Sequence, residues 1–190
     1  MTNTRPKYVR GYLWRSKLKS ILIWVIEIVL VALLALGFTY FFGKQVVVSE
    51  SSMEPTLVSG NTMLIDSLSY IFSSPERGDI IVFYTGEDER SALQIKRVIG
   101  LPGETVQIEN GQIFIDGELY LEDLNLPVIT NPGTAGEPVQ LEGNEYFVLG
   151  DNRNNSEDSR HADIGLVNKS NIMGKLWFRI SPLEDLGTVK

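Results

Sequence analysis

The composition of the chain limits which residues could perform catalysis. Its 190 residues include no cysteine and a single histidine, His161. Thiol catalysis, disulfides, cysteine-based metal centres and multi-histidine metal sites are therefore excluded. A hydrolase built from this chain would have to use a serine or threonine with a lysine, a pair of carboxylates, or His161 itself. We expect it to need neither a metal nor another cofactor.

Three polar stretches have residue types that could form such a site. They are Ser-Ser-Met-Glu-Pro-Thr-Leu at 51–57, Lys-Arg-Val-Ile-Gly-Leu-Pro-Gly at 96–103, and Gly-Asp-Asn-Arg-Asn-Asn-Ser-Glu-Asp-Ser-Arg at 150–160. Each also has a purely structural interpretation. The first would be a polar junction, the second a strand whose Lys96 extends its amine to solvent, and the third a solvated loop. A calcium loop is disfavoured, because Ser156 stands where that pattern requires glycine.

The charge is divided unequally along the chain. Residues 1–20 hold six of the 17 basic residues and none of the 24 acidic ones. The overall net charge of −7 is therefore +6 in this segment and −13 in the remainder. So acidic a remainder argues against a nucleic acid partner.

An apolar run of 22 residues, 21–42, follows the basic segment and contains one charged residue, Glu27. About 20 apolar residues span a bilayer as a helix, and flanking basic residues mark the cytoplasmic side. We therefore predict a cytoplasmic segment at 1–20, a transmembrane anchor at 21–43 and an extracytoplasmic domain at 44–190. A cleaved signal peptide would be shorter and end in small residues, whereas this run ends Tyr40-Phe41-Phe42. Glu27 would lie near the cytoplasmic interface or contact a partner helix.

The remainder of the chain predicts an all-β domain of mostly antiparallel sheets. Asn110-Gly111 and Asp116-Gly117 are strong hairpin signals. We expect a short turn at 68–72 and a long surface loop at 124–142. Short runs rich in β-branched and aromatic residues predict strands at 45–48, 62–65, 79–84, 105–108, 112–115 and 146–149.

The three stretches, together with Arg-Gly-Asp-Ile-Ile-Val-Phe at 77–83, form an ordered set of blocks. In this order, after one amino-terminal anchor, they resemble bacterial type I signal peptidase (leader peptidase), a serine–lysine protease family, in its short Gram-positive-like form. The resemblance covers residues 52–160. It implies the signal-peptidase-like β fold and an endopeptidase that removes signal peptides from exported preproteins.

The resemblance also implies roles for particular residues. Ser52 matches the nucleophile, Lys96 the general base, and Ser156 the hydroxyl that orients the lysine. Further matches are a supporting ion pair (Asp158 and Arg160), a polar frame (Asp151 and Arg153), the block that shapes the substrate groove (77–83) and the small-residue pocket (Met53, Leu57, Gln94 and Ile95).

The chemistry requires a neutral lysine. A lysine ordinarily titrates near 10.4, but burial lowers its pKa and lets it act as a base. Ile95, Val98 and Ile99 surround Lys96 in the sequence, and strand alternation places Val98 on its face and Arg97 on the opposite one. The backbone N–H of Ser52 is a plausible oxyanion donor. Glu50 stands where some family members have a second, hydroxyl donor, and we expect its carboxylate to point away from the oxyanion.

The resemblance and the anchor together predict partners and location. We expect a single-pass plasma membrane protein with its amino terminus in the cytoplasm, close to the lipid bilayer and the secretion translocon. Its substrates would be preprotein signal peptides, bound as an extended strand and cleaved after small-x-small residues. One rival is a cytosolic, DNA-binding serine–lysine repressor, which the anchor and acidic domain disfavour. Another is a membrane-anchored binding domain without catalysis. His161 would be structural, since no Gly-x-Ser-x-Gly elbow accompanies it.

Overall fold

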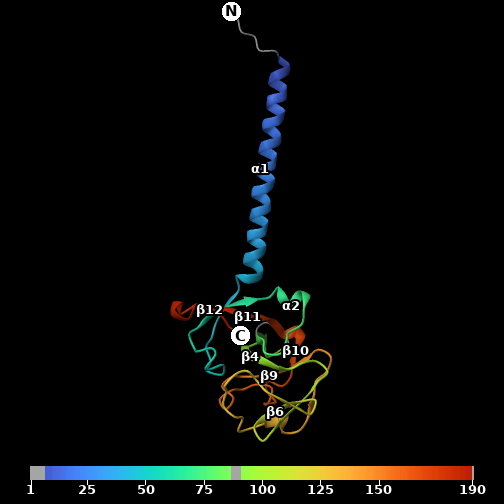
Figure 1. Ribbon diagram of the computed structural model, residues 1–190, viewed down its shortest axis with the longest axis vertical. Helices are drawn as coiled ribbons and strands as arrows, with labels where there is room; N and C mark the ends of the chain where they lie inside the picture. Colours follow the sequence, from blue (N-terminus) through green and yellow to red (C-terminus); the bar gives the residue numbers. More distant parts are fainter. Residues whose placement is uncertain (1–6, 87–90, 190) are drawn as a thin grey trace, which may run out of the picture. The chain divides into compact units, whose positions relative to one another are not determined.

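The computed structural model of the protein describes residues 7–86 and 91–189, and it divides into two compact units at the boundary between Tyr40 and Phe41. The described part of the first unit is helical and belongs to α1, Lys7–Phe42 (Figure 1). Within it, Lys17–Tyr40 has a mean hydropathy of 2.8 over its most apolar stretch. By length and composition alone, this helix could cross a membrane.

The second unit consists mainly of antiparallel β-sheet, as the sequence predicted (Figure 1). Its larger sheet has the order β1-β2-β11-β3-β4-β9-β10, and β12 pairs with β11. The strands of this sheet are β1 (Gln45–Val47), β2 (Thr62–Asp66), β3 (Ile80–Tyr84), β4 (Leu93–Gly100), β9 (Glu145–Leu149), β10 (Val167–Asn168), β11 (Ile172–Ser181) and β12 (Gly187–Thr188).

The smaller sheet has the order β7-β6-β5-β8, with strands β5 (Thr105–Glu109), β6 (Gln112–Ile115), β7 (Glu118–Tyr120) and β8 (Val139–Gln140). Both predicted hairpin turns are present. Asn110 and Asp116 have φ of 52°, and the glycines that follow them have φ of 78° and 81°. Asparagine, aspartate and glycine tolerate this left-handed conformation, so these short turns close the β5–β6 and β6–β7 hairpins.

Short helical turns connect some strands. The predicted turn at 68–72 is α2, Ser69–Phe72. The segment 124–142, expected to be only a loop, contains a 3₁₀ turn and the edge strand β8, which pairs with β5. The 3₁₀ turns are η1 (Gly133–Gly136), η2 (Lys169–Asn171) and η3 (Leu183–Asp185).

Strand β11 joins the two halves of the larger sheet, because it lies between β2 and β3. Leu176 pairs with Ile65 of β2, and Lys175 pairs with Ile81 of β3. Register shifts interrupt both pairings. Within the sheet, β11 is therefore the strand that joins β1–β2 to β3–β4–β9.

The buried apolar residues fall into clusters that support the two segments of the site. One cluster includes Met53, Leu57 and Ile65, and therefore anchors the segment that follows β1. Another includes Ile81 and Val98, on strands β3 and β4. The segment after β1 and the strands β3 and β4 are therefore both anchored by buried apolar side chains. Because closely packed interiors resist displacement, their relative positions are fixed.

Candidate active site

Ser52 lies in the turn that follows β1, with only 7% of its surface exposed. Residues about one hundred positions later hold this turn. The Asn152 backbone N–H donates to the Ser52 carbonyl oxygen at 3.0 Å, and the Asn152 side chain donates to the Ser51 carbonyl oxygen at 3.0 Å. Asn155 Nδ2 also donates to Ser51 Oγ at 3.2 Å. The sequence interpretation assigned no role to either asparagine, although both lie in the 150–160 block.

Lys96 lies on β4 and is completely buried. Its Nζ is 3.0 Å from Ser52 Oγ, so the structure brings together the two residues expected to be nucleophile and base. Ile81 of β3 is its cross-strand partner, and Val98 is the next residue on the same face. These neighbours give the amine an apolar environment.

The Lys96 amine also meets two polar side chains. It donates to Gln94 Oε1 at 2.6 Å, and Glu50 Oε2 lies 3.7 Å from Nζ. Gln94 Nε2 donates in turn to Glu50 Oε1 at 3.1 Å. The Glu50 carboxylate is thus directed toward the lysine, a contact that the sequence interpretation did not foresee.

Burial lowers the pKa of Lys96 below its ordinary value, because a charged amine is poorly solvated inside the protein. The negative charge of Glu50 is the largest opposing influence, and Asp158 and Glu157 oppose the shift as well. The net effect favours the neutral amine, which is the form that can accept a proton.

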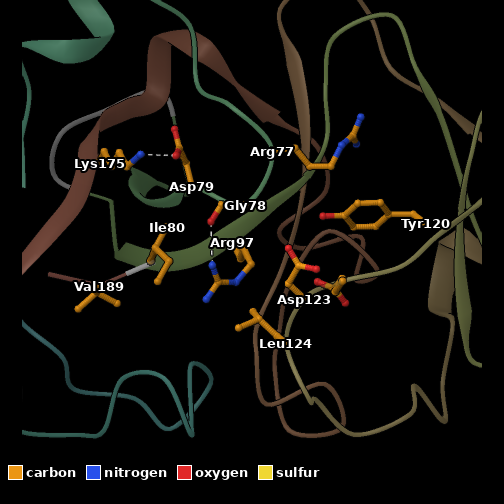
Figure 2. Close-up of a pocket in the computed structure, with 11 residues that line it drawn as sticks. Arg77, Gly78, Asp79, Ile80, Arg97, Tyr120, Asp123, Leu124, Lys175 and Val189 are labelled. Atoms are coloured by element: carbon orange, nitrogen blue, oxygen red, sulfur yellow. Dashed lines mark hydrogen bonds and ion pairs between the residues drawn. The ribbon is translucent and has the colours of Figure 1, made fainter.

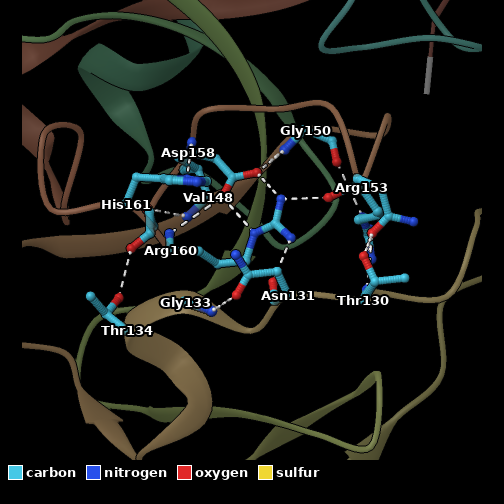
Figure 3. A network of polar contacts seen from close by, with 12 residues as sticks. Thr130, Asn131, Gly133, Thr134, Val148, Gly150, Arg153, Asp158, Arg160 and His161 are labelled. Carbon is cyan, nitrogen blue, oxygen red and sulfur yellow. Dashed lines mark hydrogen bonds and ion pairs between the residues drawn. The ribbon is translucent and has the colours of Figure 1, made fainter.

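A network of buried charges supports the loop after β9 (Figure 3). Asp158 Oδ1 pairs with Arg160 Nε at 2.8 Å, and Asp158 Oδ2 accepts the Gly150 N–H at 3.0 Å. Arg160 Nη2 also donates to the Arg153 carbonyl oxygen at 2.7 Å. The ion pair expected between Asp158 and Arg160 therefore exists, and it fixes both ends of the loop.

The two residues of the expected polar frame have separate partners. Asp151 receives two hydrogen bonds from Arg97, at 2.8 Å from Nε and 2.6 Å from Nη2. Arg153 pairs with Glu122 at 2.5 Å. Arg97 lies on β4 directly after Lys96, so the Asp151 pair connects the lysine-bearing strand to the loop after β9.

Ser156 does not hold the lysine in this structure. Its Oγ is buried and has no hydrogen-bond partner among the described residues. The hydroxyl instead lies against Gly150, where an added Cβ would be only 2.1 Å from it. Gln94 occupies the amine-holding position that the resemblance implied for Ser156.

A cavity of about 300 Å³ opens beside Ser52. Met53 and Ile95 line it, as expected. Leu57 does not, because it is completely buried in the core behind the cavity. Gln94 does not line it either, because strand alternation places its side chain on the face of Lys96, opposite to Ile95. The lining consists of Val46, Val47, Val48, Ser49, Glu50, Ser52, Met53, Leu93 and Ile95.

The block at 77–83 lies elsewhere than expected for a groove beside Ser52. Its first residues line a second cavity of about 430 Å³, together with Tyr120 and Lys175 (Figure 2). Two of the charged side chains there, Lys175 and Asp79, form an ion pair, and Arg97 donates to the Gly78 carbonyl oxygen at 2.7 Å. The rest of the block forms β3, which supports Lys96 through the β3–β4 pairing. His161 is exposed, and its Nδ1 accepts a long hydrogen bond from the Asp158 N–H at 3.5 Å.

A buried lysine in contact with a serine hydroxyl, beside an apolar cavity in an antiparallel β domain, is the arrangement of serine hydrolases that use a lysine base. Comparison with known proteins agrees with this class. The model of the signal peptidase family, peptidase S26, matches residues 21–181. The chain belongs to this family and is a serine endopeptidase of signal peptide processing.

Individual relatives show the same family. A signal peptidase I from Leptolyngbya laminosa is 39% identical over 160 residues, which cover 81% of this chain and 76% of the relative. Signal peptidase I S from Bacillus subtilis is 36% identical over 182 residues, covering 90% and 95%. A crystal structure of a signal peptidase I from Enterococcus faecalis is 32% identical, with a TM-score of 0.45 over 55% of this chain and 97% of that one.

Proposed function

We propose that this chain is a membrane-anchored signal peptidase in which Ser52 is the nucleophile and Lys96 the general base. The observation that carries this proposal is the contact of 3.0 Å between Lys96 Nζ, which is fully buried, and Ser52 Oγ. A serine hydroxyl is a weak nucleophile until a base removes its proton, and burial of the lysine supplies such a base.

The reaction follows from this pair. Neutral Lys96 takes the proton of Ser52 as Oγ attacks the scissile carbonyl carbon, and the backbone N–H of Ser52 stabilises the resulting oxyanion. Lys96 then gives the proton to the leaving amine, so that the peptide bond breaks and an acyl-enzyme remains. Water, deprotonated by Lys96, attacks the acyl carbon, and Ser52 recovers its proton as the product acid leaves.

The cavity beside Ser52 supports cleavage after small-x-small residues. Its volume of about 300 Å³ is modest, and it lies against β1, an edge strand of the larger sheet. An extended peptide can add to such an edge by main-chain hydrogen bonds, while alternate side chains enter the cavity. Small residues at alternate positions are characteristic of the cleavage point of secretory signal peptides, which the family of this chain processes.

The anchor supports the choice of substrate. Helix α1 is long and apolar enough to span a bilayer, and the basic residues before it favour a cytoplasmic amino terminus. Residues from about 44 onward would then lie outside the plasma membrane, near the translocon. Preproteins emerging there present their signal peptides to the site.

A cleavage assay tests the proposal. The full chain, purified in detergent, should process a preprotein with an Ala-x-Ala site. Ser52→Ala and Lys96→Ala should each abolish cleavage while the circular dichroism spectrum is retained, and Ser170→Ala, at an exposed serine, should cleave normally. Full activity of either site variant would reject the assignment of nucleophile and base, and a wild-type chain that does not cleave the preprotein would leave a binding domain as the better interpretation.

A further inference from the structure

Glu50 and Gln94 form a closed arrangement with the proposed base. Gln94 Oε1 is 2.6 Å from Lys96 Nζ, Gln94 Nε2 is 3.1 Å from Glu50 Oε1, and Glu50 Oε2 is 3.7 Å from Lys96 Nζ. Glu50 stands two residues before Ser52 and Gln94 two residues before Lys96. Glu50, close to Ser52 in the sequence, and Gln94, on the same strand as Lys96, thus both contact the Lys96 amine.

We propose that Glu50 and Gln94 are positioning residues for the base. In this proposal Gln94 aims the amine at Ser52, and Glu50 both fixes the Gln94 amide and sets the pH range in which Lys96 is neutral. The inference rests on the proposed function, because it assumes that Lys96 is the base.

The hydrogen-bonding capacities of the three groups explain the aiming. A neutral lysine amine has two N–H groups and one lone pair. Donation of one N–H to Gln94 Oε1 limits the directions left for the lone pair, which must face Ser52 Oγ for proton transfer. A carboxylate can only accept, so Glu50 selects the Gln94 amide orientation with its NH₂ toward Glu50 and its oxygen toward Lys96.

The charges around the amine explain the effect on pH. Glu50, Asp158 and Glu157 are the acidic groups that act on Lys96, and Glu50 acts most strongly. Asp158 is buried and forms an ion pair with Arg160. The Glu50 side chain is 52% exposed, whereas the Lys96 side chain is fully buried, so solvent and salt can reach this carboxylate. Glu157 is exposed as well, but it acts on Lys96 less strongly than Glu50 does. An anion favours protonated lysine, and its removal should let Lys96 lose its proton at lower pH.

Replacement of Glu50 by glutamine tests the charge while keeping the size of the side chain. We would measure kcat/KM for an Ala-x-Ala preprotein against pH at low salt, using the full chain in detergent. In the plot of kcat/KM against pH, the acidic limb of Glu50→Gln should lie about half a pH unit below that of wild type. This is the size of shift expected when an ion pair with one half-exposed partner is removed. Glu118→Gln, which makes the same charge change at an exposed site on β7, should leave the limb in place.

Salt and a second variant separate charge from positioning. High salt should reduce the difference between wild type and Glu50→Gln, because screening weakens the half-exposed charge. Gln94→Met, which keeps the side-chain length but not the acceptor, should lower kcat about five- to tenfold at the pH plateau with KM unchanged. A Glu50→Gln profile that superimposes on wild type, or a Gln94→Met kcat equal to wild type, would overturn the proposal.

The outcomes for this inference differ from those for the proposed function. If Ser52→Ala and Lys96→Ala are inactive but Glu50→Gln has the wild-type profile, the serine–lysine pair stands and only the role of Glu50 is rejected. If the wild-type enzyme has no acidic limb, the lysine base and the role of Glu50 are both rejected. If Glu50→Gln is slower at every pH with an unmoved limb, Glu50 is structural and the inference fails.

Discussion

Substitution of Gly150 by alanine tests how the nucleophile is held. Gly150 follows β9 and is buried against the Ser52 turn. An alanine Cβ there would lie 2.5 Å from the Ser52 carbonyl oxygen and 2.1 Å from Ser156 Oγ. Ser156 could rotate its hydroxyl away, but its Cβ would still be 2.5 Å from the added atom, and the Ser52 carbonyl belongs to the main chain. The Ser52 turn would therefore have to move by about an ångström to restore ordinary contact distances.

The size of the effect follows from this displacement. Overpacking of a buried site costs about 1–3 kcal/mol, which corresponds to a fall in melting temperature of roughly 2–10 °C for a domain of this size. A shift of about 1 Å in a reacting group costs on the order of 10²-fold in rate. We therefore expect Gly150→Ala to remain folded at 25 °C with kcat reduced about 100-fold and KM little changed.

Gly143→Ala is the matched control, because an added Cβ at that position meets nothing within 4 Å. Both variants would be assayed by preprotein cleavage at 25 °C and by thermal unfolding in detergent. The control should match wild type in both measurements. A Gly150→Ala enzyme within twofold of the wild-type kcat would refute the argument that the loop after β9 positions Ser52.

Three further predictions concern charge. The cleavage rate should fall on acidification with a single-proton dependence, since protonated Lys96 cannot accept a proton; a flat profile between pH 9 and pH 5 would contradict this. Lys96→Met should abolish cleavage yet raise the melting temperature at pH 7. Burial lowers the Lys96 pKa, so the unfolded wild-type chain holds the lysine proton more tightly than the folded chain does. Wild-type stability should therefore rise with pH. The difference in melting temperature between Lys96→Met and wild type should shrink as the pH approaches the ordinary lysine pKa of 10.5. Asp151→Asn, which removes the carboxylate charge paired with Arg97 in the interior, should cost about 3–5 kcal/mol of unfolding free energy, whereas Asp185→Asn, at a 57% exposed carboxylate, should cost less than about 1 kcal/mol. Equal losses in these two variants would show that burial of the ion pair is not the cause.

Local sequence signals predicted the β domain well. The turns at Asn110-Gly111 and Asp116-Gly117 depend on residues next to each other, and all six expected strands lie within one or two residues of the observed ones. The insertion of β11 between β2 and β3 could not be predicted in this way, because strand order depends on contacts between distant segments. The strand β8 was hidden in a segment rich in proline and glycine.

The sequence predicted the two central residues of the site, but it predicted the surrounding contacts less well. Residue types and order pointed to Ser52 and Lys96, which the structure places in contact. Alternation along β4 could have placed Gln94 beside Lys96 rather than in the pocket, since the two residues are separated by one position. No local signal could show that Leu57 is buried behind the cavity, or that Asn152 would hold the Ser52 turn from a hundred residues away.

The position of β11 has a consequence for the order in which the protein acquires activity. Ser52 lies in the connection between β1 and β2, Lys96 belongs to β4, and the strand pair β1–β2 is joined to β3–β4–β9 in the sheet by β11, Ile172–Ser181. A nascent chain shorter than about 180 residues lacks the hydrogen bonds of this strand, and only the packing of the Ser52 turn on β3 and its contacts with Asn152 relate the serine to the lysine. We therefore expect the serine and the lysine to be held firmly at their final distance only once β11 has been synthesised and has entered the sheet.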